Sequence, residues 1–136
     1  VLQLKHVENY INIRRSLWKF YINELQGIEG IEIKKFPKNI KNNFSYFPIF
    51  VDEEKYGISR DELYQRLINK NIFARRYFYP LISDFKPYSN NRTASHETLP
   101  AAYKVSRSVI CLPLHTHLNR SNIIKISNII KSSYKN

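Results

Sequence analysis

The opening residues constrain the fold of this chain most, because apolar side chains recur along one face of a helix as far as residue 25. Their spacings of three, four and seven positions form one stripe, which only Arg14 interrupts. Gly27 and Gly30 follow, as is typical of a helix end and a turn. Such a helix is too long and too one-sided to be buried within a small domain, so we expect it to pack against a neighbouring domain or a second subunit. The stripe consists of Leu4, Val7, Ile11, Trp18, Tyr21 and Leu25.

Four short stretches rich in β-branched and aromatic residues predict strands after this helix. They cover residues 31–36, 44–51, 72–78 and 109–112. The second stretch, FSYFPIFV, gives the clearest signal. Pro48 within it indicates an edge position or a bulge, because proline cannot donate a hydrogen bond to a neighbouring strand.

Three further helices are predicted. Residues 59–70 begin with a capping box, in which a serine hydroxyl and a glutamate carboxylate bind each other's backbone amides. Residues 99–103 predict a short helix with proline in its first turn. A C-terminal helix with an isoleucine-rich face is expected after Asn119 or Ser121. The order of elements is typical of an α+β domain, a small sheet with helices packed on it, preceded by a long amphipathic helix.

The composition fits one domain with a core. Of 136 residues, 43% are hydrophobic and 14% are aromatic, which excludes generic disorder. No apolar run approaches the ~18–20 residues of a membrane span. A single cysteine excludes a disulfide framework and is compatible with a cytoplasmic location. The chain has no methionine and opens inside a helical pattern, so we expect it to be a piece of a longer protein.

Few residues have the pattern of a catalytic or metal site. Cys111 lies in an apolar strand, where an inert, buried thiol is expected. His96 stands between a serine and a glutamate, but adjacent residues do not form a catalytic triad by themselves. His115 and His117 lack a third ligand at a recognisable spacing. We therefore predict neither a catalytic residue nor a metal site in this chain.

The charge leaves nucleic acid as an alternative partner. Lys and Arg number 22 against 11 Asp and Glu, a net charge of +11, and many aromatic residues are interleaved with them. The basic residues are spread over every segment, however, and no block of five or six occurs. A free-standing basic nucleic-acid-binding module is thus an alternative that the sequence does not favour.

The run Arg-Arg-Tyr-Phe-Tyr-Pro at residues 75–80 is the best local candidate for a binding site. Two guanidinium groups beside three aromatic rings suit an anionic ligand that carries a sugar or a planar ring. A structural interpretation stands beside this one. In that interpretation Tyr77 and Tyr79 face the core from a strand and one arginine is merely solvated. A polar loop over residues 83–98 follows the run and is long enough to be functional or mobile.

Several motifs in a fixed order resemble one known family. They are SYFPI at 45–49, GISRDEL at 57–63, NIFARRYFYPL at 71–81, LPAA at 99–102 and CLPL at 111–114. The set resembles the C-terminal segment of the DegT/DnrJ/EryC1/StrS family, sugar-nucleotide aminotransferases that use pyridoxal phosphate (PLP). The opening helix is similar to the connector between the family's two domains, with Arg14 or Arg15 and Tyr21 in its "R…Y" pattern.

The resemblance implies the C-terminal domain of a fold-type-I PLP aminotransferase, usually a cytoplasmic homodimer. Such a transferase passes an amino group, commonly from glutamate, to a nucleotide-linked keto-deoxysugar. Residues 1–27 would then be the connector helix and residues 28–136 the small domain. By this resemblance, we expect the family's N-terminal, PLP-binding large domain to be absent from this chain, in which no lysine matches the PLP-lysine motif. We therefore expect this fragment to be inactive alone. A non-catalytic regulatory homologue of the family is a further alternative.

By the same resemblance, the chain would contribute to the substrate site. Arg75 and Arg76 would contact anionic groups of the nucleotide-linked sugar. Tyr77, Phe78 and Tyr79 would form the wall beside the sugar or ring. The loop over residues 83–98 would act as a mobile lid. Neither a cofactor-binding residue nor a metal ligand is expected in the fragment.

Overall fold

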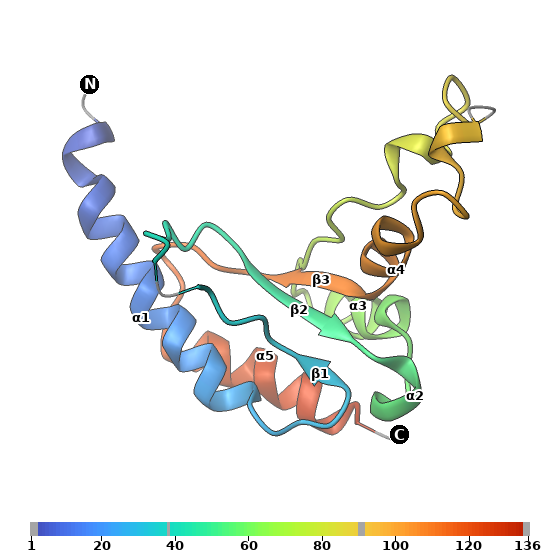
Figure 1. Cartoon of the computed structure of the whole chain (residues 1–136). Coiled ribbons are helices and arrows are strands. Elements are labelled where there is room, and N and C mark those ends of the chain that lie inside the picture. The colour runs from blue at the N-terminus through green and yellow to red at the C-terminus, as the bar shows by residue number, and fades with distance from the viewer. Residues whose placement is uncertain (1–2, 38, 90–91, 135–136) are drawn as a thin grey trace.

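The chain folds into a three-stranded antiparallel sheet that is covered on one face by two helices (Figure 1). The computed structural model describes residues 3–37, 39–89 and 92–134. Its α-helices and strands are α1 (Val7–Leu25), β1 (Ile31–Glu32), β2 (Phe47–Val51), α2 (Glu53–Tyr56), α3 (Arg60–Ile68), α4 (Pro100–Ser108), β3 (Val109–Leu112) and α5 (Arg120–Ser132). Short 3-10 turns occur at η1 (Gln3–His6), η2 (Ile82–Asp84) and η3 (Arg92–Ala94). The predicted α+β architecture is confirmed.

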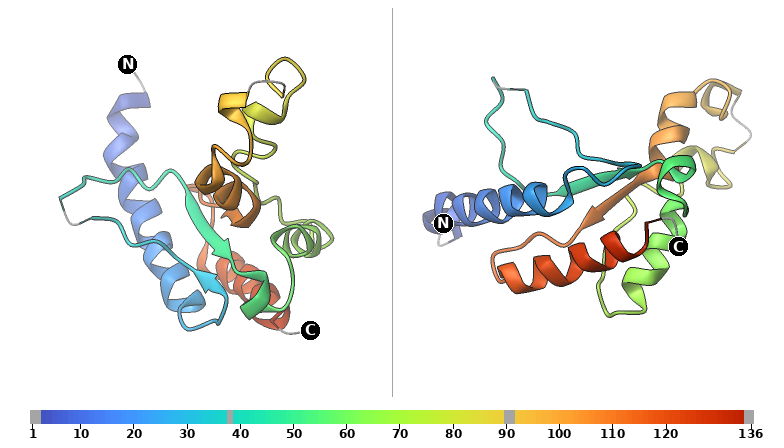
Figure 2. Two further views of the ribbon diagram at one scale, coloured as in Figure 1. Left: turned by 45° about the vertical axis from the view of Figure 1, so that its right-hand side comes forward. Right: turned by 90° about the horizontal axis from the view of Figure 1, so that it is seen from below.

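The hydrophobic core lies between the sheet and the two long helices. Side chains alternate along β2, so that Phe47, Ile49 and Val51 are buried toward the helices. The second half of α1 and most of α5 meet them there, side by side in both views of Figure 2. Tyr21 stacks on Phe47 at 4.5 Å between ring centroids. Its hydroxyl donates to the carbonyl of Pro113 at 3.0 Å, which ties α1 to the segment after β3.

The strand order is β1-β2-β3, with β2 in the middle. Pro48 of this middle strand pairs with Cys111 of β3, whose own backbone N–H and C=O are bonded to Arg75 on the far side. The ring nitrogen of Pro48 therefore points away from β3. Within the described residues, β1 pairs only with Phe50 and Val51, so no ladder hydrogen bond is lost at the proline. The predicted edge position is therefore wrong, since β2 is the central strand, and Pro48 is tolerated there because the described part of β1 does not pair with it.

The predicted strand over residues 72–78 is wrong. Among the described residues, only Arg75 of this stretch pairs with the sheet, through an isolated bridge to Cys111. The backbone turns directly afterwards, where the amide of Tyr79 donates to the carbonyl of Arg76. A turn so close to the bridge, followed by Pro80 with no amide hydrogen, leaves no room for a longer ladder.

Other boundaries differ by a few residues. The first predicted strand is confined to β1, and β2 begins at Phe47 because the amides of Phe44 and Ser45 are held by two asparagine side chains in tight turns. The predicted helix at 99–103 continues to Ser108. The capping box at Ser59 is confirmed, and Asn119 is the residue that caps α5.

The opening helix is buried along only part of its length. Leu17, Trp18, Tyr21 and Leu25 are buried, whereas the side chain of Leu4 is 73% exposed. The first half projects away from the sheet in Figure 1. Arg14 lies between the two halves and donates to the carbonyls of Asn43 and Phe44, so it fixes the segment that precedes β2. A partner for the exposed half remains a prediction. No helix in the described ranges is long and apolar enough to span a bilayer.

The turn before β1 gives a test of the fold. Gly30 has φ +78°, and a β-carbon there would overlap the backbone of Tyr56, so Gly30→Ala combines a left-handed backbone with a steric clash. We expect it to lower the free energy of unfolding by about 2–4 kcal/mol. Gly27→Ala is the matched control, because Gly27 also has positive φ but open space around it, and it should cost about 1 kcal/mol. Chemical denaturation measures both, and equal losses would contradict the clash.

Candidate functional site

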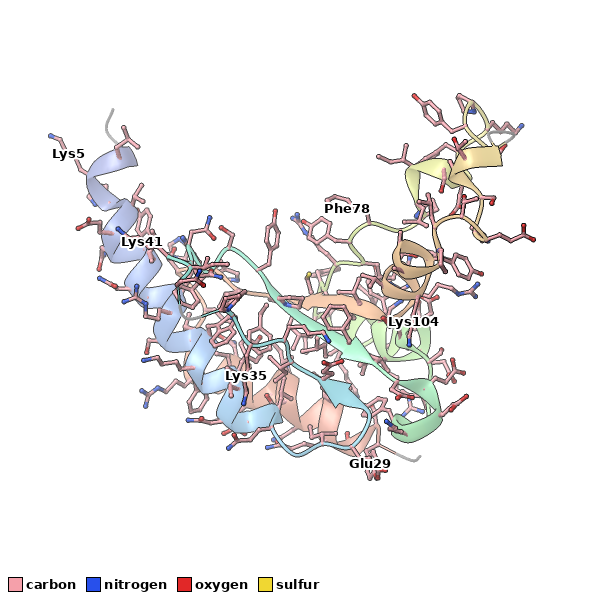
Figure 3. The ribbon with its side chains drawn as sticks, viewed as in Figure 1. Lys5, Glu29, Lys35, Lys41, Phe78 and Lys104 are labelled. Atoms are coloured by element: carbon pink, nitrogen blue, oxygen red, sulfur yellow. The ribbon has the colours of Figure 1, made fainter. Side chains whose placement is uncertain are left out.

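The run over residues 75–79 begins at the sheet edge, immediately after the bridge to β3. The structure separates its five side chains. Arg75 and Tyr77 line a pocket on one side of the run. Arg76 and Tyr79 pack toward α3 on the other side. Phe78 is 75% exposed and lies on the side of the sheet away from α1 and α5 (Figure 3).

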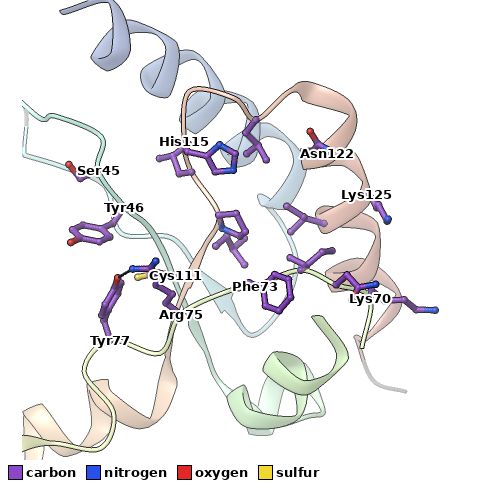
Figure 4. A pocket seen from close by; sticks show the side chains of 17 residues that line it. Ser45, Tyr46, Lys70, Phe73, Arg75, Tyr77, Cys111, His115, Asn122 and Lys125 are labelled. Atoms are coloured by element: carbon purple, nitrogen blue, oxygen red, sulfur yellow. Dashed lines mark hydrogen bonds between the residues drawn. The ribbon is translucent and has the colours of Figure 1, made fainter. Parts of the chain in front are cut away.

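The pocket has a volume of about 660 Å³ and is shown in Figure 4. Residues 70–73, 75 and 77 form one wall, residues 111–115 and 118 form another, and the first turns of α5 close it. Leucine and isoleucine side chains from β3, the segment after it and α5 make the floor apolar. A pocket of this size and lining is typical of a small-molecule site.

Aromatic rings surround the mouth of the pocket. Tyr46 and Tyr77 meet edge to face, with ring centroids 5.3 Å apart and an interplanar angle of 78°. The Nη1 group of Arg75 donates to the hydroxyl of Tyr77 at 2.6 Å. This hydrogen bond raises the pKa of Arg75 above its ordinary value. Phe73, which is 70% exposed, also lines the pocket. The mouth thus presents ring faces and a fixed guanidinium group to a ligand.

The electrostatic character of the pocket is strongly one-sided. Lys70, Arg75 and Lys125 line it together with His115, and none of the described residues in the lining is an aspartate or a glutamate. Figure 4 shows Lys70 and Lys125 at the end away from Tyr46 and Tyr77. Cations without neighbouring carboxylates attract anions, and most strongly the phosphate groups that an arginine can bind bidentately.

Arg76 has a different environment from Arg75. Its Nη1 atom lies 2.8 Å from the Oδ1 atom of Asp61, and its guanidinium group stacks on the ring of Tyr64 at 4.3 Å. The ring of Tyr79 lies 5.2 Å from the same group. The charge of Arg76 is therefore paired with a carboxylate of the chain itself, whereas the guanidinium group of Arg75 donates to the neutral hydroxyl of Tyr77.

The predicted lid forms an arm that leads away from the sheet (Figures 1 and 2). It contains η2 and η3, and residues 90 and 91 lie outside the described residues. The Nε2 atom of His96 lies 2.8 Å from the Oδ1 atom of Asp84, and the imidazole ring packs on Tyr103 at 3.9 Å. His96 therefore pairs with Asp84 and not, as a catalytic triad of adjacent residues would need, with Ser95 or Glu97. The mobility of the arm remains a prediction.

The remaining candidates have structural surroundings. Cys111 is buried, and burial raises the pKa of its thiol to about 11, which disfavours the nucleophilic thiolate. His115 and His117 have ring centroids 6.4 Å apart. In the described ranges, no three His, Cys, Asp or Glu side chains gather as metal ligands would.

Sequence reasoning missed Tyr46, Lys70 and Lys125 as pocket residues. Tyr46 precedes β2, Lys70 follows α3 and Lys125 belongs to α5, so the three are far apart along the chain. The signal that marks them as a site is the lack of carboxylates around them. This lack can be seen only once the folded chain has brought the lining residues together.

Comparison with known proteins gives a consistent picture. The family model described as the DegT/DnrJ/EryC1/StrS aminotransferase family matches residues 1–131. The dTDP-4-amino-4,6-dideoxy-D-glucose transaminase of Escherichia coli is 42% identical over 132 residues, which are 96% of this chain and 35% of that protein. The chain thus spans about a third of the length of this curated relative.

Solved structures agree on the fold. DesI, crystallised in the presence of its TDP-sugar product, matches 97% of this chain and 33% of its own with a TM-score of 0.89 and 23% identity. A putative sugar aminotransferase of Streptococcus pneumoniae, Spr1654 in its PLP form, matches 97% of this chain and 33% of its own with a TM-score of 0.84 and 21% identity. The match of the family model over nearly the whole chain is decisive: the chain belongs to the DegT/DnrJ/EryC1/StrS aminotransferase family.

Proposed function

We propose that this chain is the C-terminal part of a PLP-dependent aminotransferase that transfers an amino group to a nucleotide-linked keto-deoxysugar. Residues 1–27 would be its connector helix and residues 28–136 its small domain. Family membership supports this, as does 42% identity to a transaminase named for a dTDP-linked amino sugar. The relatives named above are transaminases or aminotransferases, which gives no support to a nucleic-acid-binding module or a non-catalytic homologue. The cytoplasmic location stays a prediction.

The pocket beside Arg75 is the observation that carries the proposal. A nucleoside diphosphate carries a planar base and two phosphates on one sugar. The tyrosine rings at one end of the pocket suit the base, and Lys70 and Lys125 at the other end suit the phosphates. Because no carboxylate lines the pocket, an anion entering it meets attraction without a repulsive neighbour.

Each residue of the run has a role in this proposal. Arg75 lies beside Tyr77, so it would bind the phosphate oxygen nearest the nucleoside, and Tyr77 would form the wall beside the base or sugar. Phe78 would cover the sugar from the exposed side. Arg76 and Tyr79 would contribute through their packing on α3, with the charge of Arg76 already paired by an aspartate. The arm over residues 83–98 would close over the bound sugar.

The cofactor would belong to a part of the protein beyond this chain. When bound, PLP supplies the electron sink for transamination. The pocket does not fit PLP itself, because it has no carboxylate to pair with the pyridine nitrogen. We therefore expect this chain alone not to transaminate. Glutamate as the amino donor and assembly as a homodimer are part of the same proposal.

A chimaera tests the proposed activity. The 132 matched residues of the E. coli relative are replaced by this chain, and transamination is measured from dTDP-4-amino-4,6-dideoxy-D-glucose to 2-oxoglutarate. We expect activity from the chimaera and none from this chain with added PLP.

Within the chimaera, Arg75→Gln should raise KM for the sugar nucleotide by about 10–100-fold, because a charge-assisted hydrogen bond is lost. Lys104→Gln, on α4 outside this pocket, is the control. Equal kinetics for both variants would contradict the role of Arg75.

Nucleotide binding by the chain itself tests the pocket. We expect calorimetric titration with dTDP to show binding that weakens with added salt. Replacing both Lys70 and Lys125 with glutamine should weaken it at least about tenfold, since two ionic contacts are lost. Replacing Lys19 and Lys35 with glutamine removes the same charge at exposed sites outside the pocket and should change the affinity less than about twofold. Equal weakening by both pairs would indicate an effect of net charge and not of the pocket.

A further inference from the structure

We propose that Arg60 is a positioning residue for the run over residues 75–79. It touches no proposed ligand, but it fixes the ring of Tyr79 and, with Asp61, the guanidinium group of Arg76. The inference rests on the proposed function, because it assigns Arg60 to the same substrate site.

Arg60 is buried to an extent that is rare for an arginine. Its residue surface is only 2% exposed, at the first position of α3. The capping box at Ser59 fixes where α3 begins, and the Nη1 atom of Arg60 donates to the carbonyl of Val109 at 2.9 Å. The guanidinium plane is thereby held between the start of α3 and β3.

The ring of Tyr79 covers this guanidinium group, with 4.7 Å between its central carbon and the ring centroid. Burial lowers the pKa of Arg60, and the carboxylate of Asp61 opposes this effect. The Nε and Nη2 atoms make no hydrogen bond within the described part of the chain, although Nε lies 3.0 Å from Asp61. Asp61 is the main compensation for this buried cation, and the negative ring face of Tyr79 adds to it, so the guanidinium group and the ring stabilise each other's position.

Asp61 extends the arrangement to a second residue of the run. Its Oδ1 atom lies 3.0 Å from Arg60 and 2.8 Å from Arg76, so one carboxylate oxygen holds both guanidinium groups. Arg76 also faces the rings of Tyr64 and Tyr79. Two residues of the run are thus fixed on α3.

This fixation determines where the rest of the run points. Arg75 and Tyr77 alternate with Arg76 along the backbone and lie on the pocket side. With Arg76 and Tyr79 held on α3, and Arg75 held at its backbone by Cys111, the intervening segment has both ends anchored. Arg60 therefore acts through Tyr79 and, with Asp61, through Arg76, which lie on the α3 side of the run. In this way it determines the position of Arg75 and Tyr77 on the pocket side, which we propose to contact the nucleotide.

The test measures the affinity of the full 136-residue chain for dTDP together with its thermal stability. Arg60→Gln and Arg60→Lys are compared, because lysine keeps the charge but has no planar group for Tyr79 to cover. We expect both variants to weaken dTDP binding about five- to tenfold and to shift the NMR signals of the Tyr77 ring. Arg75 itself is unchanged in these variants.

Tyr56→Phe is the matched control for a purely structural effect. It removes a buried hydrogen bond to the carbonyl of Ile130, on the α5 side of the core and outside the pocket. We expect it to lower the melting temperature but to leave dTDP affinity within twofold of the wild type. If Tyr56→Phe lowers dTDP affinity as much as the Arg60 variants do, Arg60 only stabilises the fold and the inference is overturned.

The outcomes separate this inference from the proposed function. If the wild-type chain binds dTDP and Arg75→Gln weakens binding while folded Arg60→Lys does not, the inference is wrong and the proposed site stands. If the wild-type chain binds no dTDP, the proposed site is wrong and the inference fails with it. Should Arg60→Gln not fold, Arg60→Lys and Asp61→Asn decide, since Asp61→Asn releases Arg76 and should weaken binding in the same way.

Discussion

Two backbone hydrogen bonds between Arg75 and Cys111 determine how the functional part of this domain is arranged. The amide of Arg75 donates to Cys111 at 2.9 Å, and the amide of Cys111 donates back at 2.8 Å. They place Arg75 at the sheet edge beside the pocket. The backbone N–H and C=O of Cys111 are bonded to Arg75 and not to β2. Pro48, which pairs with Cys111, therefore needs no amide hydrogen on that side. A proline in the middle strand and an arginine at the pocket mouth are thus consequences of one pairing.

The distribution of carboxylates separates the two arginines of the run. Asp61 lies on α3, next to the buried Arg60, and it draws Arg76 to the same side. Among the described residues that line the pocket there is no aspartate or glutamate, and the guanidinium group of Arg75 donates to the hydroxyl of Tyr77. Two adjacent arginines therefore have different surroundings, because Asp61 lies on only one side of the backbone.

The sequence was most informative where local interactions decide the structure. The capping box at Ser59 and the cap of α5 depend on residues three positions apart; the first is confirmed, and Asn119 is the one of the two predicted candidates that caps α5. Residues 72–78 were misjudged because β-branched and aromatic residues there suit a strand, while the turn after Arg76 allows a single bridge. The pocket could not be predicted, since Lys70 and Lys125 approach it only after α3 and α5 have packed.

The net charge of +11 can now be interpreted in terms of where the carboxylates lie. Several of them already pair with cations elsewhere: Asp61 with two arginines, Glu24 with Lys131, and Asp52 with Lys55. Glu62 caps α3, and the hydrogen bonds from Ser59 lower the pKa of its carboxyl, so it remains ionised in that role. Cations that line the pocket gain no such neighbour from the lining. The excess of positive charge is diffuse along the sequence, but in the fold it includes Lys70, Arg75 and Lys125 around one pocket, where we propose that it attracts an anionic ligand.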